Sequence, residues 1–481
     1  TAHGVLANES ASESDTKTIF FPSGSSPDAD IFTPMLGQDI PIIAMLNPES
    51  SPDHMDDFHC IHKSMSAALL GQRSVKEWPV IFTEQWLSRL HELVSLSSAS
   101  DLRAVFDGRD VLLASPGPSL YDSLDALKLH RDKFLLVAPI RSLLTLLEAQ
   151  IVPDFAFHVD ATDFSEIIPK HADMSKVALI CTDYAHQSVF QGGFSSIFTV
   201  PDPSMLGNGL TVALHGVTPP KLQGGCVSTC AVGFAAQLGA KSITLVGQDL
   251  SISRGNYVKQ ASDGPNLACQ SNDEASLEEF LTCVGINGER LRTQEDYLWF
   301  IGEMENAAKL FGSNLAFINS TAHGARLDGW NHCPLNDHPV ALDDAQDSRN
   351  RGDLPSLSDV DINGRVEKLR RAIADEEEAM KSAEYLCEEL VDLLHRMIKV
   401  GENNVTELET LEQRLAAFLT KKGSVLHFYT SRFSMALAAA SKSVQSLEEN
   451  LSISAEYYHQ LGPRAKKLGN MLSNAYSMLE K

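Results

Sequence analysis

The sequence predicts an α/β fold built on a mostly parallel sheet. From about residue 106 to 335, short apolar runs alternate with amphipathic stretches, which is the order of strand–helix–strand units. The runs are continuously apolar, as expected of strands that are buried on both faces. The seven expected strands are 111–114, 134–138, 155–159, 177–181, 197–200, 243–246 and 315–318.

Helical stretches between these strands complete the pattern. SLLTLLEAQ (142–150) and STCAVGFAAQLGA (228–240) have apolar residues at helical spacing, and the second ends in Gly239-Ala240, a common helix stop. We therefore expect helices on both faces of the sheet. Ligands of such sheets bind at the carboxyl ends of the strands.

The flanking regions differ from this central domain (106–340). Residues 1–105 read as a mixed α/β region, with short strands in FFPSG and IPIIAML and a helix over 84–96. The histidines at 54, 59 and 62 lack a carboxylate or cysteine at a metal-binding spacing, so we interpret them as solvated or capping residues.

The C-terminal part is predicted to be helical. A polar linker (341–360) precedes a region (361–481) in which apolar residues recur at three- and four-residue spacing, with breakers at Gly401, Gly423 and Gly462-Pro463. This pattern favours an antiparallel helical bundle. Its apolar stripe is most simply the bundle core, and a partner-binding face is the alternative.

Composition excludes several classes of function. The net charge of −24 opposes binding to nucleic acid. No stretch approaches the roughly 20 apolar residues of a membrane span, and the N-terminus lacks the order of a secretory signal, so a cytoplasmic protein is expected. The eight cysteines form no paired CxxC framework, which favours reduced thiols. Cys226 and Cys230 lie one helical turn apart among small apolar residues, which favours packing over metal binding.

The stretch DVLLASPGPSL (110–120) carries the first sign of chemistry. Its apolar run ends in Ser115-Pro116-Gly117-Pro118-Ser119, a turn expected to leave backbone N–H groups available to an anion. Ser119 is placed to cap a following helix, whose N-terminus favours phosphate. An ordinary strand-to-loop turn is the alternative.

Polar residues gather at the ends of the other expected strands. They are Asp160 (with Thr162 and Asp163) after 155–159, Gly224, Gly225 and Ser228 at the start of helix 228–240, Gln248 and Asp249 after 243–246, and Asn319, Thr321 and His323 after 315–318. Each of these groups, taken alone, is also explained by a structural role, such as capping a helix or shaping a turn. Together they offer the hydroxyls, amides and carboxylates that a nucleotide-sugar site needs.

The order of these elements resembles a known family. GPSL, PDFAFHVDAT, GGCVST, LGAKSITLVGQDLS and FINSTAHGARLDG look like the central domain of the Maf (motility-associated factor) flagellin glycosyltransferases, over about half of the chain. The resemblance implies transfer of a nonulosonic acid, of the pseudaminic or legionaminic type, from CMP to Ser or Thr of flagellin. It also implies a Rossmann-like central domain similar to that of bacterial sialyltransferases.

The resemblance assigns roles to residues. It implies that CMP contacts Gly117, Pro118 and Ser119, that Asp160 lies beside the donor, that Gly224, Gly225 and Ser228 line the pocket, and that Gln248 and Asp249 lie at its centre. Two positions depart from the family. Cys226 stands where Ser is usual, and Asn256-Tyr257 stands where a Thr-His pair is common, which puts an imidazole base there in doubt.

The expected reaction is direct displacement of CMP with inversion at the sugar. Asp249 or His323 is the candidate base for the acceptor hydroxyl, and Tyr257 is the candidate to stabilise the departing phosphate. No D-x-D motif follows an expected strand of this domain, so we expect no metal and no cofactor besides the CMP-sugar donor.

Two other functions fit the same elements. Archaeal-type hydroxymethylpterin pyrophosphokinases resemble this chain around G-P-S and G-Q-D-L and would use ATP with Mg²⁺, although the long helical C-terminal region weighs against them. The third possibility is a nonenzymatic flagellin-binding module.

Overall fold

A computed structural model describes most of the chain after residue 79. The described residues are 80–170, 172–201, 208–216, 222, 224–252, 281–342, 360–400, 404–419, 425, 429 and 447–480, together with the paired two-residue strands β1 (Leu6–Ala7) and β2 (Ile19–Phe20). The expected strand in IPIIAML, the three N-terminal histidines and Tyr257 lie outside these residues.

A parallel sheet of nine strands forms the centre of the described structure. Its spatial order is β13-β12-β9-β4-β5-β6-β7-β8-β3, and every neighbouring pair is parallel. The strands are β3 (Ser97–Ser98), β4 (Asp110–Ala114), β5 (Leu135–Pro139), β6 (Phe155–His158), β7 (Ala178–Thr182), β8 (Ile197–Val200), β9 (Ser242–Val246), β12 (Ala316–Asn319) and β13 (Asn331–His332). All seven expected strands are confirmed.

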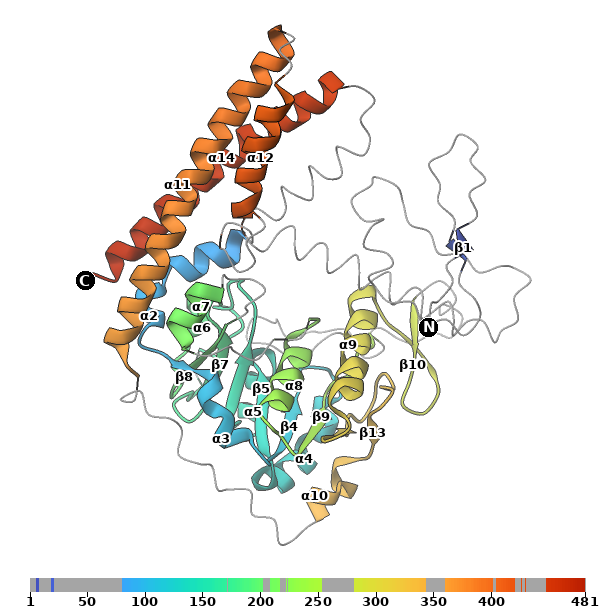
Figure 1. The fold of residues 1–481 in the computed structure, drawn as a ribbon. Helices are drawn as coiled ribbons and strands as arrows, with labels where there is room; N and C mark the ends of the chain where they lie inside the picture. The colour runs from blue at the N-terminus through green and yellow to red at the C-terminus, as the bar shows by residue number, and fades with distance from the viewer. Residues whose placement is uncertain are drawn as a thin grey trace.

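Helices cover both faces of the sheet (Figure 1). They are α3 (Arg103–Phe106), α4 (Leu120–His130), α5 (Leu143–Glu148), α6 (Gln187–Phe190), α8 (Val227–Gln237), α9 (Glu295–Phe311) and α10 (Pro339–Leu342), beside a hairpin of β10 (Thr282–Val284) and β11 (Arg290–Arg292). The remaining helix of this part of the chain, α7 (Asn208–His215), packs against the C-terminal helices. Along β4, Val111 and Leu113 pack against the α8–α9 side, whereas Leu112 and Ala114 pack against the α4–α5 side. Burial on both faces explains why the strand sequences do not alternate.

The strand order reverses direction between β4 and β9. From β4 the chain adds β5, β6, β7 and β8 on one side, and it then returns to add β9, β12 and β13 on the other. A crevice therefore lies at the carboxyl edge of the sheet, between the loop that follows β4 and the loop that follows β9. Such a switch point is where open α/β sheets bind ligands.

The sheet extends beyond the expected central domain at its N-terminal side. β3 precedes residue 106, yet it is the edge strand beside β8. Before it, a helical segment (80–88) continues into α2 (Leu90–Leu93), close to the helix expected over 84–96.

The C-terminal region forms a long helical arm that projects from the α/β domain (Figure 1). It comprises α11 (Ile362–Val400), α12 (Val405–Leu419) and α14 (Leu447–Met478). Arg370 donates to the Leu479 carbonyl at 3.0 Å, and Lys466 lies 2.8 Å from Glu384, so α11 and α14 are antiparallel as expected.

One expected helix break is wrong, because α14 continues through Pro463. Its neighbours Leu461 and Ala465 are fully buried against the arm, and a Cβ placed on Gly462 would lie 3.3 Å from Cys387 Cβ. Gly462 thus allows α14 to approach α11 closely. Tertiary packing here outweighs the low helix propensity of the Gly-Pro pair.

The apolar stripe of the arm is core. Leu369, Ile373 and Leu390 of α11 belong to one buried cluster with residues of α14, the helical segment 80–88, α2 and α7. The arm is thereby anchored to the α/β domain. In the part of the chain that the structure describes, no helix is long and apolar enough to cross a membrane.

Candidate functional site

A narrow cavity of about 110 Å³ opens at the switch point. The cavity is lined by the carboxyl ends of β5 (Pro139) and β6 (His158) and by the loops after β4 (Ser115, Pro116, Gly117), β5 (Ile140, Arg141), β6 (Phe164) and β9 (Gly247, Gln248, Asp249, Leu250). The start of α8 (Cys226, Val227, Ser228) and α9 (Tyr297, Phe300) complete the lining. Pockets that enclose whole small molecules usually reach about 300–1,000 Å³. A cavity of this volume has room for only part of such a molecule.

The backbone N–H groups of the Ser115–Ser119 loop are engaged within the protein, which corrects the expectation that they are available to an anion. Ser115 N–H donates to Val246 O at 2.9 Å, and Gly117 N–H donates to Gly247 O at 2.7 Å. Ser119 N–H donates to Asp249 Oδ2 at 3.0 Å. The prolines have no N–H. The loop therefore contributes the surface of Ser115, Pro116 and Gly117 to the cavity wall, including the Ser115 hydroxyl, and not a set of N–H donors.

Two glycines allow the loops after β4 and β9 to interlock. A Cβ on Gly117 would lie 2.4 Å from the Gly247 carbonyl oxygen, and a Cβ on Gly247 would lie 2.3 Å from the Ser115 carbonyl oxygen. Gly247 also has a φ of +68°, which favours glycine. Gly117 and Gly247 therefore allow the loop after β4 and the loop after β9 to pack directly against each other.

Asp249 holds the loop after β4. Its carboxylate accepts hydrogen bonds from both the backbone N–H and the hydroxyl of Ser119, and its side chain is buried. These two contacts tie the start of α4 to the loop after β9. Asp249 thus holds the loop after β4 through Ser119, while its role as the base and the contact of Ser119 with CMP stay predictions.

The start of α8 forms another wall of the cavity. Ser228 Oγ lies 2.9 Å from Ser115 Oγ, which joins this wall to the loop after β4. Cys226 is the N-cap, and burial raises the pKa of its thiol while N–H groups of Thr229 and Ser228 act in the opposite direction. Gly224 and Gly225 precede this wall and do not line the cavity.

Gln248 lines the cavity, while Asn319 and Thr321 lie behind it. Gln248 N–H donates to Thr321 Oγ1 at 3.2 Å, and Thr321 N–H donates to Asn319 Oδ1 at 3.1 Å. The Gln248 side chain is 6% exposed, and its Oε1 has no hydrogen-bond partner. Buried polar groups without a partner are rare, so Gln248 is the expected residue that most needs a ligand.

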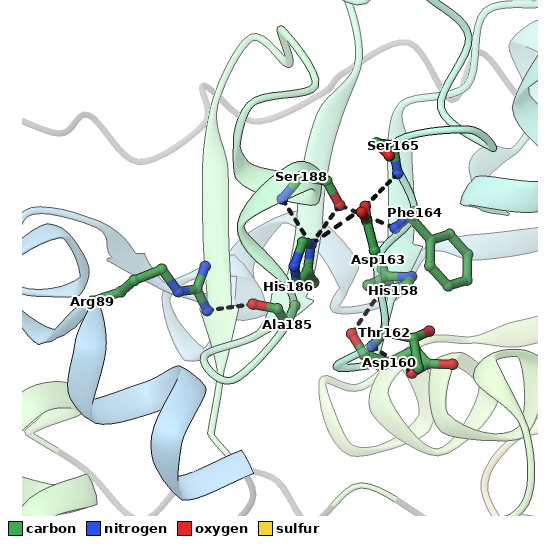
Figure 2. A network of polar contacts seen from close by, with 10 residues as sticks. All are labelled: Arg89, His158, Asp160, Thr162, Asp163, Phe164, Ser165, Ala185, His186 and Ser188. Atoms are coloured by element: carbon green, nitrogen blue, oxygen red, sulfur yellow. Dashed lines mark hydrogen bonds and ion pairs between the residues drawn. The ribbon is translucent and has the colours of Figure 1, made fainter. Parts of the chain in front are cut away.

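The other expected residues lie around the cavity rather than in it. Asp160 Oδ1 accepts from Thr162 N–H at 2.9 Å, and Asp163 Oδ1 accepts from Ser165 N–H at 2.8 Å, so both acids shape the loop after β6 (Figure 2). His323 is exposed and does not line the cavity, and Pro118 is buried behind it.

Several lining residues were not expected. Phe164, Tyr297 and Phe300 supply aromatic surface, and Arg141 supplies a cation whose guanidinium carbon lies 5.0 Å from the centre of the Phe164 ring. Arg141 follows the expected strand 134–138 by three residues, so the strand-end rule that selected the other candidates could have found it. The aromatics of α9 carry no comparable signal.

His158 is a neutral histidine in the cavity wall. Its Nε2 donates to the Asp160 carbonyl oxygen at 2.8 Å (Figure 2), which leaves Nδ1 as an acceptor. Burial lowers the pKa of His158 to about 4, and the nearby Arg141 charge acts in the same direction. His158 therefore carries no charge at neutral pH.

Comparisons with known proteins agree with this architecture. The solved structure of a Maf glycosyltransferase from Magnetospirillum magneticum AMB-1 matches with a TM-score of 0.52 and 14% sequence identity, over 94% of this chain and 70% of that chain. The chain has the fold of a Maf glycosyltransferase. The Maf-like match is long enough to include the arm as well as the α/β domain. The resemblance seen in the sequence is thus confirmed for the fold.

A family model matches part of the chain and corresponds to the pyrophosphokinase-like alternative named in the sequence analysis. The model described as 6-hydroxymethylpterin diphosphokinase MptE-like matches residues 84–255, which include β4, α8 and β9. No curated protein matches the sequence. Among the described residues, no cluster of three or more His, Cys, Asp or Glu side chains could hold a metal ion. Metal independence stays a prediction.

Proposed function

We propose that this chain is a glycosyltransferase that moves a nonulosonic acid, of the pseudaminic or legionaminic type, from a CMP-activated donor to Ser or Thr of flagellin. We place this activity in the cytoplasm, where it serves flagellum assembly and motility. The observation that carries the proposal is a cavity at the switch point of a fold shared with a Maf glycosyltransferase. Its cation, hydroxyls and aromatic side chains suit a nucleotide.

The proposed reaction is a single displacement at the sugar. The bond from the anomeric carbon to the CMP phosphate breaks as the acceptor oxygen bonds to the opposite face. Because the donor is already activated, no covalent enzyme intermediate is needed. The acceptor hydroxyl must lose its proton to a base, for which Asp249, in the cavity wall, and His323, outside it, are the candidates.

Intact-mass measurement of flagellin tests the proposal. Flagellin co-expressed with this chain and a CMP-nonulosonate supply should gain the mass of whole nonulosonate residues. Gln248→Leu should reduce the gain strongly, because Gln248 lines the cavity. The exposed Gln460→Leu, on α14, is the matched control and should leave the gain unchanged. Flagellin that binds the chain but keeps its mass would indicate a binding module.

The MptE-like match favours a second candidate, transfer of diphosphate from ATP to a hydroxymethylpterin. This reaction requires Mg²⁺ with ATP, whereas the glycosyltransferase requires CMP recognition. Thermal-shift measurements with CMP and with ATP–Mg²⁺ separate the two. Stabilisation by ATP–Mg²⁺ and not by CMP would contradict glycosyl transfer.

A further inference from the structure

The cavity is electrically asymmetric. Among its described lining residues, Arg141 is the single lysine or arginine. The cavity's carboxylate, Asp249, is bonded to Ser119. The start of α8, an 11-residue helix, adds the partial positive charge of a helix N-terminus beside Val227 and Ser228. An anionic group would be held at this positive side.

Arg141 and Gln248 lie on opposite sides of the loop after β4. The neighbouring strands at this edge run β9, β4, β5; Gln248 follows β9, and Arg141 follows β5. Two strand spacings separate these outer strands, about 10 Å. A ligand that reaches both residues crosses the carboxyl end of β4.

Arg141 and Gln248 are suited to bind different chemical groups of a ligand. The Arg141 guanidinium suits a phosphate, which it can bind through two parallel hydrogen bonds. The Gln248 side chain is 94% buried, and its unpartnered Oε1 needs a donor such as an amine or a hydroxyl. A nucleoside monophosphate carries both groups, with the phosphate at one end and the base amine at the other.

We propose that Arg141 binds the phosphate of the nucleotide and Gln248 accepts a hydrogen bond from its nucleoside end, so that the nucleotide lies across the carboxyl end of β4. The loop Ser115–Ser119 then forms the floor beneath the nucleotide, since its N–H groups are engaged elsewhere. The inference rests on the proposed function only in taking a nucleotide as the ligand, and it holds for either transferred group.

Calorimetric titration of the full chain with CMP, cytidine, AMP and adenosine tests this orientation. Wild type should bind one monophosphate at least about 10-fold more tightly than its nucleoside. Arg141→Met should remove about 10- to 100-fold from monophosphate affinity and leave nucleoside affinity unchanged, because one charged hydrogen-bonding partner is lost. Gln248→Leu should weaken both ligands by the same factor and keep their ratio.

Two variants guard against trivial outcomes. Arg141→Lys keeps the charge beside Phe164 and should restore part of the monophosphate preference, which a folding defect would not do. Arg371→Met removes the same charge from an exposed position on α11 and should change nothing.

The proposal is overturned if Arg141→Met keeps the wild-type ratio, if wild type binds monophosphate and nucleoside equally, or if none of the four ligands binds. Its failure is distinct from that of glycosyl transfer. If the chain binds AMP through Arg141 but leaves flagellin unmodified, the proposed orientation of the nucleotide stands and the proposed glycosyl transfer fails.

Discussion

Asp249 and Ser119 illustrate what a residue's type and position leave open. Both residues were expected at the carboxyl edge of the sheet, and both are there. The expectation paired each with a ligand, whereas they pair with each other across 130 residues of sequence. A strand-end rule locates a polar side chain at an edge but does not identify its partner, because the partner depends on how two distant loops pack.

This pairing predicts strong coupling between the two side chains. Hydrogen bonds to charged groups contribute about 1.5–3 kcal/mol, so Asp249→Ala and Ser119→Ala should each lower the free energy of unfolding by about that amount. The double variant should cost clearly less than the sum, since either change breaks the same contact. Urea denaturation of wild type, the two single variants and the double variant measures this coupling free energy, and the exposed Asp328→Ala is the control. Additive costs would contradict the contact.

His158 predicts a pH dependence of stability. Its pKa falls from 6.5 in a model peptide to about 4 in the fold, chiefly through burial. As pH drops below 6.5 the unfolded chain gains a proton that the native protein does not take, so stability falls between pH 6.5 and 4. The loss should reach roughly 3 kcal/mol, by 1.36 kcal/mol per pKa unit.

Denaturation curves at pH 7 and pH 4.5 test this linkage. His158→Phe removes the titrating group while keeping an aromatic ring beside Phe164, so it should lose markedly less stability on acidification than wild type does. The exposed His459→Phe should keep the wild-type pH dependence. Equal pH profiles for wild type and His158→Phe would show that the histidine is not held neutral.

At the scale of elements, the sequence was most informative where burial is strongest. The central strands among the seven expected carry continuous apolar runs because both of their faces meet helices, as in β4, β5, β6 and β7. β3 and β13 were missed because they are two-residue edge strands made of Ser97-Ser98 and Asn331-His332, which contain no apolar residue. Edge pairing depends on a neighbouring strand, and a local pattern does not record it.

The helices show the same division between local and tertiary causes. The spacing of apolar residues predicted α11 and α12, whereas Gly462-Pro463 suggested a break that α14 does not have. Within the site, sequence reasoning found the two interlocking motifs and Gln248. It missed Arg141, although that residue follows an expected strand, because the groups sought at the strand ends were hydroxyls, amides and carboxylates and not a lone cation.

At the scale of the molecule, the arm shares a buried core cluster with the helical segment 80–88, α2 and α7, which is separate from the two clusters that cover the sheet. Trp86 and Leu90, from the helices before β3, pack in the same cluster as Leu214 of α7 and Leu369 of α11. Polar contacts reinforce this junction, since Trp86 Nε1 and His215 Nε2 lie 3.0 and 3.3 Å from buried Asp183 Oδ2. At the start of the arm, Arg365 donates to the Leu96 carbonyl at 2.6 Å. The arm is therefore anchored to the domain that carries the cavity.

A shared core predicts that the two parts unfold together. Leu369 is fully buried, so Leu369→Ala should cost about 2–5 kcal/mol, a large part of the stability of a typical domain. Helicity, to which the long arm helices contribute most, and tryptophan fluorescence, which includes Trp330 in the core of the α/β domain, should report one coincident transition in urea, shifted equally by the substitution. Leu129→Ala, at an exposed leucine of α4, should shift neither signal. Two separate transitions, with only helicity responding to Leu369→Ala, would instead mean that the arm is an independent unit, and the cavity at the switch point would then be stable without it.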